Sequence, residues 1–579
     1  MEKQMKTAVH ITHESMKKIG GIGTVLNGVC TTKAYKNFFD RTVFYGPLFG
    51  TSIDVLVDLE KTGEVLFSSA DGHDKGNYGE LFNGIRQKYG IDIIYGRRRL
   101  VDEFDEVKKN VADVFLIGTS AMNQVEVSKF KFILWEKFGI QSDLYPNDCD
   151  YEQYLRIAIP FLEILNKVYG TKVDYYYFAH EYMGIPSALS AISQKKHKTI
   201  FVAHEVSTAR FLVENCPGHD ISFYNILHNE QGKKSLEEVF GSQKQNPRNE
   251  LVKLTPNFER IFAVSDLTKE EYLFLVPDTP LKKIKAVYNG LSVQKISVEQ
   301  KRQSRKKIQE YIHTLLDFKP DVILTHVTRL VMSKGLWRDI SLLYYLDEIF
   351  QSQNLKGAYI LLSTFIATGR PSEYILRMEK DYGWPINHRK GWPDLMGMEA
   401  EIYSYLQIFN QKSKAIKGIF INQFGFNREK CGLRVPEDAQ FIDLRIASDA
   451  EFGFSIYEPF GIAQLETVPF GGIAVLSSSC GSASFLKKTF KDAKIKPYYV
   501  MDFIGAGAQI KREKLNKLTI EKRTVIEREL FAKHAKSIFE TLPITETQKA
   551  KYLENAILHN SRLSWENIVQ NNLLPNLPT

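Results

Sequence analysis

Two carboxylates in the stretch FSIYEPFGIAQLETVPFGG have a spacing that suits a ligand rich in hydroxyl groups. Glu458 stands directly before Pro459, and proline is tolerated in the first turn of a helix, where its missing N–H has no partner to lose. The pattern predicts a helix that begins beside Glu458, near the N–H groups of Gly461 and Ile462. Glu466 would lie about two turns further on, too far for a close catalytic pair. Carboxylates accept hydrogen bonds from sugar hydroxyls, so we expect this helix to contact a ligand at two places.

Two cations flank the turn in HVTRLVMSKG, directly after a strand candidate. Arg329 can hold a phosphate with its planar fork of donors, and Lys334 can act as a point charge. The pair therefore suits a diphosphate. The alternative interpretation is a solvated loop with ordinary charges.

A glycine-rich turn follows the first strand candidate, in HESMKKIGGIGTVLNG. Gly20, Gly21 and Gly23 precede a helix that we expect to start near Thr24, and Lys18 stands just before them. Glycines let a ligand approach the backbone, and a helix N-terminus favours negative charge. The spacing is not the GxGxxG fingerprint, so a plain strand-to-helix turn is the alternative.

Two histidines end neighbouring strand candidates, YYYFAH and TIFVAH. His180 is followed by Glu181, and His204 is followed by another glutamate. A lone histidine is commonly structural, but ligands of open parallel sheets bind beyond the carboxyl ends of the strands. Both histidines are therefore candidates for substrate contact.

Short apolar runs alternate with longer amphipathic ones along the whole chain, which predicts an α/β fold with parallel sheets covered on both faces. The pattern restarts near Asp321 after a polar helical stretch. We expect two Rossmann-like, doubly wound domains with a cleft between them. The expected division is an N-terminal acceptor-side domain (1–295), a C-terminal nucleotide-sugar-binding domain (296–545), and a helical segment that packs back toward the first domain (546–579).

The totals exclude several classes of protein. The net charge of +8 comes from 76 basic and 68 acidic residues, an excess too mild for a nucleic-acid partner but suited to anionic small molecules. The five cysteines form no CxxC pair, and no cluster of metal ligands is visible. We see neither a signal peptide nor a membrane-spanning run, so we expect a cytoplasmic protein. Assembly into a homo-oligomer is left open, and the arginine run YGRRRL is interpreted as a solvated loop.

Short segments spread over residues 8 to 569 resemble, in order, the motifs of one protein family. They are KKIGGIGTVL, HEYMGIPSALSA, VAHEVSTARFL, VYNGLSV, RLVMSKG, YEPFGIAQLE and SWENIV. The first is similar to a K-x-G-G-L/I loop, the fifth to an R-x4-K phosphate pair, and the sixth to an E-x7-E motif. The family is that of the glycogen and starch synthases, retaining glycosyltransferases of the GT-B fold, and DISFYNIL resembles its eukaryotic type.

The resemblance implies transfer of glucose from UDP-glucose or ADP-glucose to the non-reducing end of an α-1,4-glucan, with no cofactor or metal required. It implies that Arg329 and Lys334 offset the charge of the departing diphosphate. Glu458 would hold the donor glucose, Glu466 would accept from the ribose, and His204 would face the reacting centre. The other substrate-binding candidates are Lys18, Gly20, Gly21, Gly23, His180, Glu181, Gly461, Ile462 and Ser478.

One segment departs from the family pattern. SSSCGSASF stands where the family has a pair of glycines, so the loop expected to bind the diphosphate carries Ser478, Ser479 and only Gly481. Two alternatives follow. The chain is a GT-B transferase with another acceptor, such as a sucrose-type glycoside or a different polysaccharide, or it is a non-catalytic glucan-binding protein on the same scaffold.

Overall fold

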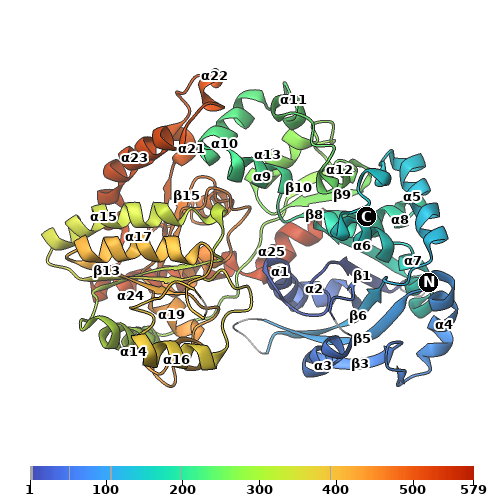
Figure 1. Ribbon diagram of the computed structural model, residues 1–579, viewed down its shortest axis with the longest axis horizontal. Helices are drawn as coiled ribbons and strands as arrows, with labels where there is room; N and C mark the ends of the chain where they lie inside the picture. The colour runs from blue at the N-terminus through green and yellow to red at the C-terminus, as the bar shows by residue number, and fades with distance from the viewer. Residues whose placement is uncertain (1–3, 51, 103, 105–106, 197, 392) are drawn as a thin grey trace. The chain divides into compact units, whose positions relative to one another are not determined.

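The computed structural model describes residues 4–50, 52–102, 104, 107–196, 198–391 and 393–579, which form two compact units (Figure 1). Unit 1 takes in the described residues of Met1–Ala209, Glu230–Ser292 and Ser564–Thr579, and unit 2 those of Arg210–Asn229 and Val293–Leu563. The break after Ser292 lies beside the boundary expected after residue 295. The division into three domains, with a cleft between two of them, stays a prediction.

Unit 1 is built on a mixed sheet. Among the described residues its strands lie in the order β10-β9-β8-β7-β1-β2-β6-β5-β3-β4. Their bounds are β1 Lys6–Ile11, β2 Arg41–Pro47, β3 Gly63–Ser68, β4 His73–Asp74, β5 Asp92–Val101, β6 Lys109–Gly118, β7 Asp174–His180, β8 Thr199–Ala203, β9 Arg260–Ala263 and β10 Ile284–Ala286. The strands from β10 to β6 run parallel, as predicted. The antiparallel edge of β5, β3 and β4 is an addition that the sequence pattern did not indicate.

The helices of unit 1 cover this sheet and fill the irregular stretch after β8. They are α1 Gly21–Cys30, α2 Lys33–Phe38, α3 Ser52–Thr62, α4 Tyr78–Tyr89, α5 Gln124–Phe138, α6 Cys149–Ile157, α7 Phe161–Tyr169, α8 Glu181–Ser193, α11 Leu236–Phe240, α12 Pro247–Val252, α13 Asp266–Leu275 and α25 Trp565–Ile568. Helix α9 (Ser207–Asn215) runs from unit 1 into unit 2, and most of α10 (His219–Glu230) belongs to unit 2.

Unit 2 is built on a parallel sheet. Among the described residues its strand order is β13-β12-β11-β14-β15-β16. The strands are β11 Val322–Val327, β12 Gly357–Leu362, β13 Ile416–Ile421, β14 Ala450–Gly453, β15 Ile473–Ser477 and β16 Tyr498–Met501. Numbered within the unit, this is the order 3-2-1-4-5-6 of the doubly wound dinucleotide-binding fold, which confirms the predicted fold class. The order reverses between β11 and β14, and such a reversal is where ligands bind.

The same kind of reversal occurs in unit 1, between β1 and β7. There the chain adds β2 and β6 on one side of β1 and later adds β7 to β10 on the other. Each unit therefore has one position at which the connections after two adjacent strands run to opposite sides of the sheet. Ligands of open parallel sheets bind at such positions.

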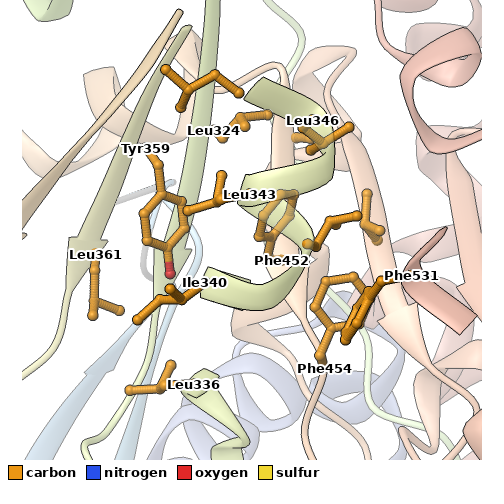
Figure 2. Packing of buried hydrophobic residues seen from close by; sticks show 14 of the residues in the cluster. Leu324, Leu336, Ile340, Leu343, Leu346, Tyr359, Leu361, Phe452, Phe454 and Phe531 are labelled. Carbon is orange, nitrogen blue, oxygen red and sulfur yellow. The ribbon is translucent and has the colours of Figure 1, made fainter. Parts of the chain in front are cut away.

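The helices of unit 2 share its buried core with the strands of the sheet. They are α14 Val298–Leu316, α15 Leu336–Ser352, α16 Ser372–Tyr382, α17 Glu399–Lys412, α18 Arg428–Cys431, α19 Phe441–Ala447, α20 Ser482–Thr489, α21 Phe503–Ala506, α22 Arg512–Leu515, α23 Ile520–Thr541 and α24 Glu546–Leu563. Figure 2 shows the packing around α15. Its Leu336, Ile340, Leu343 and Leu346 recur at helical spacing and pack in one buried cluster with Tyr359 of β12. Burial of each such side chain stabilises the unit by roughly 1.5 to 3 kcal/mol, which fixes α15 and the turn before it.

Candidate functional site

The turn after β11 carries a lysine at the strand-order reversal of unit 2. This turn is a short 3-10 helix, η3 (Met332–Lys334), followed by Gly335 with a φ of +62°, in the left-handed region. A Cβ at Gly335 would meet the carbonyl oxygen of Phe454 at 2.5 Å. Only glycine therefore lets the turn approach the chain after β14 so closely. The close approach places Lys334 against that segment.

Lys334 and Glu458 form an ion pair in which the ammonium group contacts the carboxylate Oε2. Both side chains are 11% exposed, so the pair is almost buried but still reaches the surface of unit 2. Gln464 donates to the same oxygen at 3.3 Å, and the Gly481 N–H donates to the Glu458 carbonyl at 2.8 Å. Gly461 has a φ of +89°, and a Cβ there would meet the Glu458 Cγ at 2.9 Å. The pair uses one of the three ammonium donors, so Lys334 retains donors for an anion.

The prediction of a helix that begins beside Pro459 is wrong. The segment instead contains two 3-10 helices, η4 (Ala463–Leu465) and η5 (Val468–Phe470). A proline inside η5 has no N–H to give, and Gly471 with a φ of +77° ends that helix. Half-buried Ile462 precedes η4 as its cap residue. The expected geometry of one helix touching a ligand twice therefore does not exist.

Glu466 is held by a buried arginine. Arg445 Nε donates to the Glu466 Oε2 at 2.8 Å, and Arg445 Nη1 lies 2.9 Å from Glu451 Oε2. Arg445 and Glu451 are fully buried, whereas the Glu466 side chain is 12% exposed. This arrangement anchors the end of η4 on the core of unit 2. Its proposed contact with a ribose stays a prediction.

The other two predicted residues of unit 2 differ in how they are held. Arg329 is exposed, and within the described parts of the chain its guanidinium has no hydrogen bond or ion pair. The hydroxyl of half-buried Ser478 accepts from the Ile504 N–H at 3.0 Å. Its neighbour Ser479 is buried and donates to the Ser455 carbonyl at 2.7 Å. The serine loop is thus tied to the chain that leads to Glu458.

Sequence reasoning missed a buried ion cluster that supports this site. Arg338 donates to Asp220 at 2.9 and 2.7 Å and to Glu527 at 2.9 and 2.7 Å. Its Nη1 also donates to the Phe454 carbonyl at 3.3 Å, and Ser479 donates to Asp220 at 3.1 Å. Removal of one partner from such a buried ion pair strongly destabilises the folded state, because the other charge stays buried without compensation. The partners lie 118 and 189 residues from Arg338, so no local pattern could indicate the cluster.

In unit 1 a carboxylate already occupies the glycine turn. Glu14 Oε2 accepts the N–H groups of Ile19 at 2.6 Å and Gly20 at 2.7 Å, and Glu14 is 2% exposed. A Cβ at Gly23 would meet that oxygen at 2.5 Å, so glycine is required there. The N–H groups of the turn are thus already used by a carboxyl group of the same chain. The role of Gly20 and Gly23 toward a substrate stays a prediction.

The surroundings of the turn complete this picture. Helix α1 begins at Gly21, three residues before the expected start, and a Cβ at Gly21 would meet nothing within 4 Å. Lys18 is exposed at the edge of the turn. Arg98 of β5, in the run interpreted as a solvated loop, is buried, and it donates to the carbonyls of Glu14 at 2.9 Å and Ser15 at 3.1 Å. The arginine therefore fixes the backbone of the segment that leads into the turn.

The structure brings both predicted histidines together and adds a third. His180 Nδ1 lies 2.8 Å from His204 Nε2, and His180 Nε2 lies 2.9 Å from Nδ1 of His10 in β1. Burial lowers the pKa of His10 and of His204 to about 3 and holds the pKa of His180 well below its usual value. All three rings are therefore neutral near pH 7. His10 sits inside an apolar strand, and only its alignment beside β7 could have indicated its role.

Glu181 begins α8 in an unusual conformation. Its φ of +56° is rare for a residue other than glycine, and such strain concentrates at functional sites. Its carboxylate accepts the Glu205 N–H at 2.7 Å. Burial, followed by the charge of Glu205, raises its pKa well above the usual value. Glu181 thus holds the loop that carries His204.

Two features are absent from the described residues. These residues contain no group of three or more His, Cys, Asp and Glu side chains that converges as metal ligands do. Every helix that the structure describes is too short or too polar to span a bilayer.

No protein-family model matches the chain, and no curated protein matches it. Solved structures do show a distant similarity in backbone fold. An α,α-trehalose-phosphate synthase (UDP-forming) from Burkholderia vietnamiensis has a TM-score of 0.49 at 11% identity, with 99% of each chain covered. The Burkholderia xenovorans enzyme of the same description, in complex with glucose-6-phosphate, has 0.48 at 12%, again with 99% of each. The catalytic domain of starch synthase IV from Arabidopsis thaliana, bound to ADP and acarbose, has 0.45 at 14%, covering 95% of this chain and 99% of that one. Scores below 0.5 do not establish a family.

Proposed function

We propose that this chain is a retaining glucosyltransferase of the GT-B type that moves glucose from a nucleotide diphosphate glucose to the non-reducing end of an α-1,4-glucan, in the manner of a glycogen synthase. The observation that carries the proposal is the Lys334–Glu458 pair at the strand-order reversal of unit 2. A reversal in an open parallel sheet is a nucleotide-binding position. The ordered motifs of the sequence supply the reaction.

Unit 2 would bind the donor. The diphosphate gains charge as its bond to the sugar breaks, and fixed cations lower the energy of that transition state. Lys334 would supply the donors that Glu458 leaves unused, and exposed Arg329 would add a planar fork. Glu458 would accept from the donor glucose, and Glu466 from the ribose. The N–H groups of Gly461 and Ile462 and the hydroxyl of Ser478 would border the same ligand.

Unit 1 would present the acceptor side. His204 would contact the donor sugar near the reacting centre, with His180 and Glu181 behind it. The glycine turn with Gly20, Gly21 and Gly23 would lie near the leaving group, and Lys18 would reach a donor phosphate or the acceptor. Exclusion of water from the donor would prevent its hydrolysis.

A donor screen tests the proposal. The purified protein is incubated with UDP-glucose or ADP-glucose, each with and without glycogen, and the released nucleoside diphosphate is measured. We expect release from one donor that depends on glycogen, with new α-linkages by proton NMR. Absence of turnover with both donors and all acceptors would overturn the proposal.

The same screen separates the alternatives. Release that depends on a small sugar or sugar phosphate rather than on glycogen would identify a transferase with another acceptor. Calorimetry with both donors covers the third case, because a glucan-binding scaffold without activity should bind neither.

A further inference from the structure

Three histidines and a tyrosine form one hydrogen-bonded row in unit 1. Tyr35 OH lies 3.0 Å from His10 Nε2, His10 Nδ1 lies 2.9 Å from His180 Nε2, and His180 Nδ1 lies 2.8 Å from His204 Nε2. The members come from α2, β1, β7 and the end of β8, because these strands are neighbours in the sheet. Tyr35, His10 and His180 are at most 3% exposed, and His204 is half-buried. The row therefore leads from the core to the surface at the reversal between β1 and β7.

The geometry allows only two proton arrangements. A neutral imidazole donates from one nitrogen and accepts at the other, and every link here joins Nδ1 of one ring to Nε2 of the next. Either all three rings carry the proton on Nδ1, or all three carry it on Nε2. Burial keeps each ring neutral, since it lowers the pKa of His10 and of His204 to about 3 and that of His180 well below its usual value.

The buried end of the row selects between the two. Two groups that carry a proton approach His10 Nε2, the Tyr35 hydroxyl at 3.0 Å and the Cys30 thiol at 3.8 Å. Thr42 already donates to the Tyr35 oxygen at 3.2 Å. The phenol proton can go to the His10 nitrogen or to the neighbouring Cys30 sulfur, and the imidazole nitrogen is much the stronger acceptor of the two. Burial raises the pKa of Cys30 to about 12 and that of Tyr35 well above its usual value, so both groups keep their protons. His10 Nε2 is therefore an acceptor.

We propose that this row fixes His204 as its Nδ1–H tautomer, so that the ring presents a permanent hydrogen-bond donor to substrate and does not act as a base. His204 Nδ1 has no hydrogen-bond partner among the described residues. The group it suits is an oxygen with lone pairs, such as a sugar hydroxyl or a phosphoryl oxygen. Tyr35, His10 and His180 are positioning residues, and this assignment rests on the proposed function for the identity of the ligand.

Nitrogen-15 NMR of the full chain labelled at histidine tests the tautomer directly. The His204 signals are assigned by their loss in H204Q. We expect Nδ1 of His204, His180 and His10 to carry the proton at pH 7. A proton on Nε2 of His204, or a charged ring, would overturn the proposal.

A matched pair of variants tests the cause. Y35F removes the phenol proton and keeps the ring, so we expect the Nε2–H form of His204 to appear in at least about half of the molecules. Y177F is the control, because Tyr177 is a buried tyrosine of β7 whose hydroxyl has no partner among the described residues. An unchanged His204 tautomer in folded Y35F would overturn the proposal, and if Y35F does not fold, the wild-type tautomer decides.

Activity gives the second readout. With the donor found in the screen, Y35F should lower kcat/KM by about 2- to 10-fold, from loss of the donor in half of the molecules up to the full effect of one lost hydrogen bond to substrate, while Y177F stays at the wild-type value. The two proposals fail separately. If no donor is turned over, the proposed function fails while the NMR result stands, and an Nε2–H His204 in an active enzyme refutes only the fixed donor.

Discussion

The strand-order reversals of the two units carry opposite kinds of chemistry. In unit 2 the strand ends hold charges in pairs, Lys334 with Glu458 and, deeper, Arg338 with Asp220. In unit 1 they hold a row of neutral rings that ends at His204. One fold principle therefore yields an electrostatic site in one unit and an uncharged hydrogen-bonding site in the other.

The difference follows from the cost of burial. A charge removed from water needs partners, so buried Arg338 has acids beside it and buried Lys301 donates to two backbone carbonyls, while exposed Arg329 has no partner among the described residues. Neutral imidazoles need only hydrogen bonds, which the row supplies internally. A diphosphate suits the first arrangement and a sugar hydroxyl suits the second.

The largest expected effect comes from breaking the ion pair of unit 2. K334A should lower transfer by roughly 10²- to 10³-fold, about 3 to 4 kcal/mol, because the departing diphosphate loses a fixed cation. Steady-state release of nucleoside diphosphate measures it. K307A is the control. Lys307 lies on α14, is half-buried like Lys334, and forms an ion pair with Asp438, with 3.0 Å between Nζ and Oδ2. Near-normal turnover of K334A would remove Lys334 from the mechanism.

The double variant separates stability from activity. In K334A the Glu458 carboxylate remains almost buried without its cation, which costs about 1 to 3 kcal/mol of stability. K334A/E458A should recover much of that loss in urea denaturation while remaining inactive. Recovery of activity in the double variant would show that the pair has only a structural role.

Acid should destabilise unit 1 through its neutral rings. The pKa of His10 and of His204 is lowered to about 3 by burial, so the unfolded chain binds more protons than the folded one between about pH 6.5 and 3. Their contribution to stability is complete above pH 6.5 and is lost as pH falls. The free energy of unfolding should drop by up to ~1.4 kcal/mol per pH unit for each ring.

Urea denaturation at pH 7, 6 and 5 measures this slope. H180Q should reduce the slope by the contribution of about one histidine, because it removes one group that protonates on unfolding. H313Q, which changes an exposed histidine of α14, is measured alongside as the comparison variant. Equal slopes in H180Q and wild type would contradict the neutral row.

Two glycines of one turn provide a smaller and sharper test. G23A should cost about 1 to 3 kcal/mol, because its Cβ would lie 2.5 Å from Glu14 Oε2 and 2.8 Å from the Lys18 Cα. G21A meets nothing within 4 Å and should change stability by less than about 1 kcal/mol, in the stabilising direction. Thermal melting compares the two. Equal melting temperatures would show that Glu14 does not occupy the turn.

Local patterns predicted the elements well. The apolar runs at β1, β7, β8 and β11 all form strands, and the polar stretch at Val298–Leu316 forms α14, because alternation and helical periodicity are short-range signals. The antiparallel edge of unit 1 escaped because its strands mix charged and apolar residues, as in β5. The expected helix after Glu458 failed because Gly461 and Gly471 adopt left-handed conformations.

Residues that face each other across the fold were harder to predict. Lys334 and Glu458 each had a motif of their own, so both were found. Glu14, His10 and Asp220 had none, since their roles depend on partners that only the sheet and helix packing bring near. Sequence spacing indicates the chemistry of a strand end but not the neighbour that completes it.

The smallest expected effect concerns the serine that stands where the resembled family has a glycine. Ser478 accepts the Ile504 N–H at 3.0 Å, so S478A leaves that donor without its partner and should cost about 1 kcal/mol of stability. Its own hydroxyl proton has no acceptor among the described residues and remains available to a phosphate oxygen. S478A should therefore also lower kcat/KM by roughly 3- to 10-fold, the range of one neutral hydrogen bond. S484A is the comparison, because the Ser484 hydroxyl donates to the Gly481 carbonyl at 3.2 Å. A loss of stability with unchanged kcat/KM in S478A would make the serine a purely structural tie, and the donor site would then depend on the charged residues of unit 2.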